Sequence, residues 1–149
     1  WYNNSMKIFI GSDHAGYELK EKIQKYLKEL GHETEDMGAF EYEADDDFPD
    51  FIKPVAQAVA NNNESMGVIL GGSGQGEAMC ANKVPGIRAT VYYGGNLDII
   101  KLARDHNNAN ILSLGARFIT EEEAKNAVKG FLDLKFSGDQ RHVRRIEKM

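Results

Sequence analysis

The strongest strand pattern in the chain is Met66-Gly67-Val68-Ile69-Leu70, which runs directly into Gly71-Gly72-Ser73-Gly74-Gln75-Gly76-Glu77. A short apolar run that ends in glycine is typical of a strand buried on both faces of a parallel sheet. The residues that follow, through Lys83, favour a helix. This strand, turn and helix form the central unit of an α/β domain.

Strand and helix patterns alternate on both sides of this unit. The periodicity predicts further strands over residues 7–10, 32–37, 87–93 and 111–114. It predicts helices over residues 17–31, 51–60 and 97–103, and a last core helix that begins with the capping box Thr120-Glu121-Glu122-Glu123. Pro54 suggests a delayed start for the helix over 51–60. The alternation indicates the α/β class, with a five-stranded parallel sheet covered on both faces.

The composition sets limits on the class of protein. The net charge is −5 and no basic stripe precedes the last ten residues, which argues against a nucleic-acid partner. The single cysteine, Cys80, forms no internal disulfide and gives no sign of an oxidising compartment. No apolar run has the roughly 18 residues that a membrane helix needs. We therefore expect a cytoplasmic protein with no membrane partner.

The chain shows no repeat and no linker that would divide it. Met6 is a natural start, so we expect residues 1–5 to be a remnant of an added segment. Residues 6–149 are then expected to form a single domain that ends in a basic arm.

The glycine-rich turn is typical of an anion site. Glycines allow the backbone N–H groups to curl around an oxyanion, and the next helix adds its positive N-terminus. The turn is not a Walker A loop, because Gly76 is followed by Glu77-Ala78 rather than Lys-Ser/Thr. It is not a dinucleotide fingerprint either, because Glu77 stands where the third glycine belongs. A tight structural turn is the alternative explanation.

Glu77 is the candidate catalytic base. An acidic residue in the first turn of a helix is favoured on electrostatic grounds alone. Beside an oxyanion cradle, however, a carboxylate is also the base that removes a proton α to a carbonyl. Cys80 is interpreted as a small core residue rather than a nucleophile, since no histidine lies near it in sequence.

Further polar residues stand near the ends of the predicted strands. Asp13 and His14 follow the first strand, and Asp13 could also serve as a helix cap. His106 and Asn107 precede the fifth strand, where a histidine could stabilise a helix end or act as an acid or base. Arg117 follows the fifth strand and could bind an anion or form a surface ion pair.

The only basic cluster lies at the C-terminus. On a helix, Arg141 and Arg145 share a face at i, i+4, a spacing that suits a grip on phosphate. A solvated tail is the ordinary alternative. A nucleic-acid contact is disfavoured because no aromatic residues are interleaved with the arginines. An arm beyond the last core helix could also reach a neighbouring subunit.

Six motifs occur here in the order of a known family: GSDHAGY from Gly11, GGSGQGE from Gly71, ANKVPGIRA from Ala81, DHNNAN from Asp105, LGAR from Leu114 and RHVRRI from Arg141. By these motifs the chain resembles the ribose-5-phosphate isomerase B family, within the wider group that includes galactose-6-phosphate and allose-6-phosphate isomerases. The resemblance covers nearly all of residues 6–149.

The resemblance implies a Rossmann-like three-layer αβα sandwich that forms a homodimer or a tetramer, with active sites built from both subunits. It implies that His106 helps to open the furanose ring, that Asp13 contacts the sugar near its reacting oxygens and that Asn107 binds substrate. The backbone of Gly72, Ser73, Gly74, Gln75 and Gly76 would hold the enediolate oxygen, assisted by the Ser73 side chain. The residues implied around the phosphate are His14, Arg117, Arg141 and Arg145, the last two from the partner subunit.

Two branches of this family use different bases. One has a cysteine where this chain has Gly71, and the other has a glutamate where this chain has Glu77, so the chain resembles the glutamate branch. The implied reaction interconverts ribose 5-phosphate and ribulose 5-phosphate: Glu77 takes the proton from C2 and returns it at C1. No cofactor is expected, and no metal, because the sequence has no ligand spacing typical of one. The alternatives are a hexose-6-phosphate isomerase (allose or galactose) and a non-catalytic phosphosugar- or nucleotide-binding module.

Overall fold

The computed structural model describes residues 5–149, and its centre is a five-stranded parallel sheet. The strand order is β2-β1-β3-β5-β4. The strands are β1 (Lys7–Ser12), β2 (Glu33–Asp36), β3 (Ser65–Gly71), β4 (Ala89–Tyr92) and β5 (Ile111–Gly115). Residues 1–4, most of the expected remnant, lie outside the described part of the chain.

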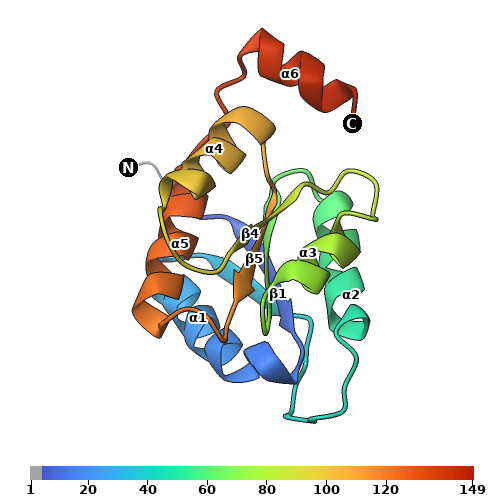
Figure 1. The fold of residues 1–149 in the computed structure, drawn as a ribbon, viewed down its shortest axis with the longest axis vertical. Coiled ribbons are helices and arrows are strands. Elements are labelled where there is room, and N and C mark those ends of the chain that lie inside the picture. The colour runs from blue at the N-terminus through green and yellow to red at the C-terminus, as the bar shows by residue number, and fades with distance from the viewer. Residues whose placement is uncertain (1–4) are drawn as a thin grey trace.

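Helices cover both faces of the sheet (Figure 1). They are α1 (Tyr17–Glu29), α2 (Pro49–Ala60), α3 (Gln75–Ala81), α4 (Asp98–Asn107), α5 (Glu121–Asp133) and α6 (Gln140–Glu147), with the short 3-10 helix η1 (His14–Gly16) before α1. One apolar cluster joins the sheet to α1, α4 and α5 through residues such as Ile23, Ile100 and Phe131. A second cluster joins the other face to α2 and α3 through residues such as Ile52, Val55 and Ala81. The predicted αβα sandwich with a Rossmann-like parallel sheet is confirmed.

The alternation of side chains along β3 explains this layering. Val68 and Leu70 belong to the first cluster, while Ile69 belongs to the second, because successive residues of a strand face opposite sides of the sheet. β3 pairs with β1 on one side and β5 on the other. A strand in that position is buried on both faces, as its continuous apolar run predicted.

The prediction that Pro54 delays the start of its helix is wrong. α2 begins at Pro49, five residues earlier, and continues through Pro54. Proline at the first position of a helix is favourable because its fixed φ is helical and no N–H is needed there. Pro54 then removes only the hydrogen bond to the carbonyl of Asp50, an exposed residue whose carbonyl can be solvated.

The ends of the sheet differ in what surrounds them. The turns after β1, β3 and β5 meet at the C-terminal edge of the strands, as the register of Ser12, Leu70 and Leu114 shows. The end of α4 and the helix α6 lie at the opposite, N-terminal edge; α6 stands at the top of Figure 1, clear of the sheet. Within residues 5–149, no helix has the length and apolar character needed to cross a bilayer.

Candidate active site

The glycine-rich turn is folded tightly against β5. Gly74 has a φ of +78°, which a residue with a side chain rarely adopts. A β-carbon at Gly74 would also lie 3.0 Å from the carbonyl carbon of Leu114. The hydroxyl of Ser113 donates a 2.7 Å hydrogen bond to the Gly74 carbonyl and so holds the turn in place. Because the first N–H groups of a helix have no partner within it, the turn and the start of α3 can present main-chain donors to an anion.

Glu77 lies in the first turn of α3 with only 5% of its surface exposed. Its carboxylate points back toward the end of β3, because a β-carbon built on Gly71 would overlap the Glu77 carboxylate. A glycine at position 71 is therefore what makes room for the acid. The arrangement places a buried carboxylate directly beside the glycine-rich turn.

The surroundings of Glu77 raise its pKa. Burial is the main cause, because it disfavours the charged form, and the nearby charge of Asp13 acts in the same direction. A hydrogen bond from the Glu77 backbone N–H partly opposes the shift. The ring of Phe48 packs against the start of α3, with its Cζ 3.0 Å from where a β-carbon on Gly76 would lie. A carboxylate with a raised pKa is better matched to taking and returning a proton near neutral pH.

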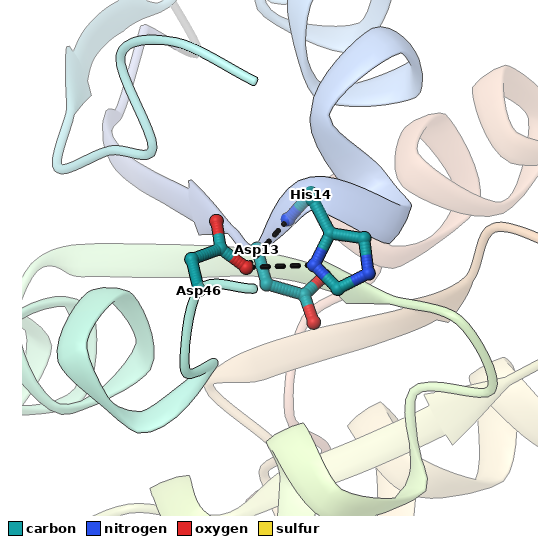
Figure 2. A group of neighbouring side chains, drawn as sticks. All are labelled: Asp13, His14 and Asp46. Carbon is teal, nitrogen blue, oxygen red and sulfur yellow. Dashed lines mark hydrogen bonds and ion pairs between the residues drawn. The ribbon is translucent and has the colours of Figure 1, made fainter. Parts of the chain in front are cut away.

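Asp13 and His14 lie at the same edge of the sheet, as the sequence predicted. Asp13 is buried, and its carboxylate accepts a 3.0 Å hydrogen bond from the Ala15 N–H, so it also caps η1. His14 contacts Asp46, which comes from the acidic loop before α2: the two atoms His14 Nδ1 and Asp46 Oδ1 are 2.7 Å apart (Figure 2). The backbone N–H of His14 donates to the same Asp46 oxygen at 3.2 Å.

These three residues also form a geometrically possible metal site. Asp13, His14 and Asp46 each offer one ligand atom, and the three atoms lie within 4.8 Å of one another. This group could not be predicted from the sequence, because Asp46 lies 32 residues from His14. In the structure the ring Nδ1 of His14 is already hydrogen-bonded to Asp46.

Arg117 lies beside the glycine-rich turn. Its backbone N–H donates to the Gly72 carbonyl at 3.0 Å, and its Nη1 is 3.1 Å from where a β-carbon on Gly72 would lie. The side chain is exposed. Ser73 is in the same turn, where its hydroxyl accepts a 3.2 Å hydrogen bond from the Gln75 N–H. A cation and a ring of main-chain groups thus flank the buried carboxylate.

The remaining predicted residues lie elsewhere in the chain. α4 starts after β4 and returns along the sheet, so His106 and Asn107 lie next to the beginning of β5. At about 3.3 Å per residue, the five residues of β5 separate them from the turn by about 15 Å or more. One chain therefore does not bring His106 and Asn107 to Glu77.

The basic arm lies with His106 at this second edge. The rings of His106 and His142 stack with centroids 4.3 Å apart, and the Ser137 hydroxyl donates to the Asp105 carbonyl at 3.0 Å. Arg141 is exposed at the start of α6, one turn before Arg145. A hollow of about 640 Å³ separates the arm from the body of the molecule. It is lined by residues of the connection before β4, α4 and the C-terminal arm, among them Asn82, Arg88, Asn107, Ile146 and Met149.

Three residues of the first edge were not found from the sequence. From the sequence, Asp46 is one of several acids in a loop, Phe48 belongs to no motif, and Ser113 lies within a strand. Each of these residues reaches the site only through tertiary folding. The one local signal in the sequence is Phe48, an apolar residue directly after three aspartates. Cys80, in contrast, packs against the second apolar cluster, and burial raises its pKa, which fits a core residue.

The chain has extensive similarity to known proteins. The model of a family described as Ribose/Galactose Isomerase matches residues 8–149. Ribose-5-phosphate isomerase B of Mycobacterium tuberculosis is 44% identical over 144 residues, covering 97% of this chain and 88% of the relative. The probable ribose-5-phosphate isomerase B of Mycoplasma genitalium is 41% identical and covers 97% and 94% of the two chains.

Solved structures agree with these relatives. A ribose 5-phosphate isomerase from Thermotoga maritima superposes with a TM-score of 0.89 and 45% identity, over 96% of each chain. The Mycoplasma genitalium ribose-5-phosphate isomerase B, crystallised with bound ribulose-5-phosphate, gives a TM-score of 0.90 and 41% identity, over 95% of this chain and 92% of the other.

Proposed function

The chain belongs to the ribose/galactose isomerase family, and from this premise we propose that it interconverts ribose 5-phosphate and ribulose 5-phosphate. Curated relatives at 41–44% identity carry the name ribose-5-phosphate isomerase B. A structural neighbour of that name holds ribulose-5-phosphate. The observation that carries the proposal is the buried Glu77 carboxylate beside the glycine-rich turn, with a raised pKa.

The proposed proton transfer follows from this geometry. Glu77 removes the proton from C2 of the open-chain aldose, and negative charge moves to the carbonyl oxygen at C1. Main-chain N–H groups of residues 72–76, assisted by Ser73, hold the enediolate oxygen. The proton of the C2 hydroxyl passes to the C1 oxygen, and Glu77 returns its proton at C1 to give the ketose. Main-chain donors are effective here because they are already oriented before the charge develops.

The remaining residues bind and prepare the substrate. Asp13 lies near the sugar oxygens, and His14 and Arg117 contact the phosphate from the same side. His106 helps to open the furanose ring, Asn107 binds the sugar, and Arg141 and Arg145 grip the phosphate. The last four lie at the far edge of the sheet in this chain.

That separation supports a site shared between two subunits. Each chain would supply Glu77, the glycine-rich turn, Asp13, His14 and Arg117 to one site. It would supply His106, Asn107, Arg141 and Arg145 to the site of its partner, so a homodimer, or a tetramer of such dimers, would be the active form. The exposure of Arg141 and the hollow beside α6 are consistent with an arm that reaches another chain. Because phosphorylated sugars are charged and retained in cells, a cytoplasmic location fits this substrate.

The substrate can be tested with purified protein. Ribose 5-phosphate, allose 6-phosphate and galactose 6-phosphate are supplied separately, and formation of each ketose is followed in a coupled assay. We expect the highest kcat/KM for ribose 5-phosphate. Preference for either hexose phosphate would assign the chain to the hexose branch, and no turnover of any of the three would contradict isomerase activity.

A further inference from the structure

The contact between His14 and Asp46 is more elaborate than a surface ion pair. One carboxylate oxygen, Asp46 Oδ1, accepts from both the ring Nδ1 of His14, at 2.7 Å, and its backbone N–H, at 3.2 Å. The Asp46 side chain is 7% exposed and that of His14 is 22% exposed. Two hydrogen bonds from one residue to one buried oxygen fix both the backbone and the ring of His14.

Both hydrogen bonds of the Asp46 side chain are formed with His14. Its second oxygen, Oδ2, is buried and has no hydrogen-bond partner among residues 5–149. A buried carboxylate is costly unless it is paired, so the hydrogen bonds from His14 are what offset the burial of Asp46. Neighbouring Asp45 and Asp47 are exposed instead.

The loop that carries Asp46 is anchored to the segment that carries His14. The N–H of Ala39 donates to the Ser12 carbonyl at 2.7 Å, and the N–H of Ser12 donates to the Gly38 carbonyl at 2.8 Å. The fully buried Lys20 binds both Asp36 and the Ala39 carbonyl at 2.8 Å. These bonds fix the start of the loop, at Gly38 and Ala39, beside the end of the strand that leads to His14.

The hydrogen bond determines which ring nitrogen is free. With an ionised Asp46, Nδ1 of His14 must carry a proton and donate it. The other nitrogen, Nε2, lies on the far side of the ring from Asp46 (Figure 2). The groups that face the ring are Asp46, the adjacent Asp13 and Tyr42, whose ring meets it edge-on at 6.0 Å. The ring is therefore oriented with Nε2 available to a ligand.

We propose that Asp46 is a positioning residue, which holds His14 in the Nδ1-protonated form and turns Nε2 toward the phosphate of the substrate. This inference rests on the proposed function, because it takes the phosphate to be the ligand of His14. Asp46 itself does not touch the sugar phosphate. When both ring nitrogens carry protons, Nδ1–H donates to Asp46 and Nε2–H can donate to a phosphate oxygen.

The test combines a structural readout with kinetics. Long-range ¹H–¹⁵N spectra of the histidine rings report the tautomer, and the spectrum of His14→Ala identifies the His14 signals among the four histidines. The variants are Asp46→Ala, which removes the acceptor, and Asp46→Asn, which keeps an acceptor oxygen without the charge. Asp45→Ala is the matched control, since it removes an exposed carboxylate from the same loop. Circular dichroism and the Tm show whether each variant is folded.

For the neutral ring of His14 without substrate, we expect the Nδ1–H tautomer in the wild-type protein, the same tautomer in Asp45→Ala, and a mixture of both tautomers in Asp46→Ala. For ribose 5-phosphate, KM should rise on the order of 10-fold in Asp46→Ala, with kcat nearly unchanged and a smaller rise in Asp46→Asn. A neutral ring of His14 with its proton on Nε2 in the wild type, or a KM in Asp46→Ala equal to that of Asp45→Ala, would overturn the inference. Absence of turnover in the wild-type protein would instead overturn the proposed function.

Discussion

The carboxylate of Glu77 occupies the space that a side chain on residue 71 would fill. A β-carbon built on Gly71 overlaps both Oε1 and Cδ of Glu77. In the family that this chain resembles, the expected base is either a cysteine at the position of Gly71 or a glutamate at the position of Glu77. Side chains at these two positions would therefore occupy the same space. In this chain the glutamate fills it and residue 71 is glycine.

Gly71→Ala tests this relationship. The added methyl group collides with the end of a side chain rather than with backbone, so the protein should fold while the carboxylate is displaced. A displacement of the base by about 1 Å can cost on the order of 10²-fold in rate, and we expect a loss of kcat of that order. The measurement is kcat for ribose 5-phosphate.

Gly130→Ala is the matched control for this substitution. Gly130 lies in α5, and a β-carbon there has no atom within 4 Å. It should keep wild-type kcat and gain roughly 0.5–1 kcal/mol of stability, the usual helix preference for alanine. Equal kcat in Gly71→Ala and Gly130→Ala would show that Glu77 does not need this space.

The raised pKa of Glu77 predicts a pH-dependent effect on stability. Between the unfolded and the raised folded pKa, the native state binds more protons than the unfolded state, so stability falls as pH rises through this window. Glu77→Gln removes the titrating group. We therefore expect a higher Tm than wild type at neutral pH and a difference that shrinks as pH falls below the unfolded pKa of glutamate.

Thermal unfolding of both proteins across this pH range provides the measurement. A Tm difference that is constant with pH would mean that the pKa of Glu77 is not raised by folding.

How far the sequence could predict this site depends on whether a residue's position is set locally. The strand before Gly71 and the helix start at Glu77 are separated by a short turn, so their proximity was predictable from the chain alone. Asp46 was not, because it reaches His14 through a loop whose path depends on Lys20 and Ser12. The return of α4 could have shown that His106 lies at the other edge, since a helix between parallel strands runs back along the sheet.

Substitution of Arg141 should weaken substrate binding. Loss of a charged hydrogen bond to phosphate in Arg141→Ala should raise KM for ribose 5-phosphate on the order of 10-fold or more, with a smaller effect on kcat. Arg144→Ala removes the same charge from the same helix but leaves the i, i+4 pair of Arg141 and Arg145 intact, and should change KM much less. Indistinguishable KM values for the two variants would exclude a specific phosphate contact at Arg141.

Mixing two impaired variants, assayed with ribose 5-phosphate well below the KM of Arg141→Ala, tests whether two chains share a site. Glu77→Gln and Arg141→Ala affect opposite edges of the sheet, so a mixed dimer has one site with both defects and one site with neither. Purified mixed dimers, made with two affinity tags, should regain a substantial part of the wild-type activity. Activity no higher than the mean of the two parent variants would indicate sites contained within single chains.

Turnover of ribose 5-phosphate by Glu77→Gln shows whether Glu77 is the base. Glutamine keeps the shape of the side chain but cannot accept the C2 proton, so kcat should fall by about 10²- to 10⁴-fold. Binding of ribose 5-phosphate, measured by calorimetry, should persist. Wild-type kcat in a folded Glu77→Gln protein would contradict the account.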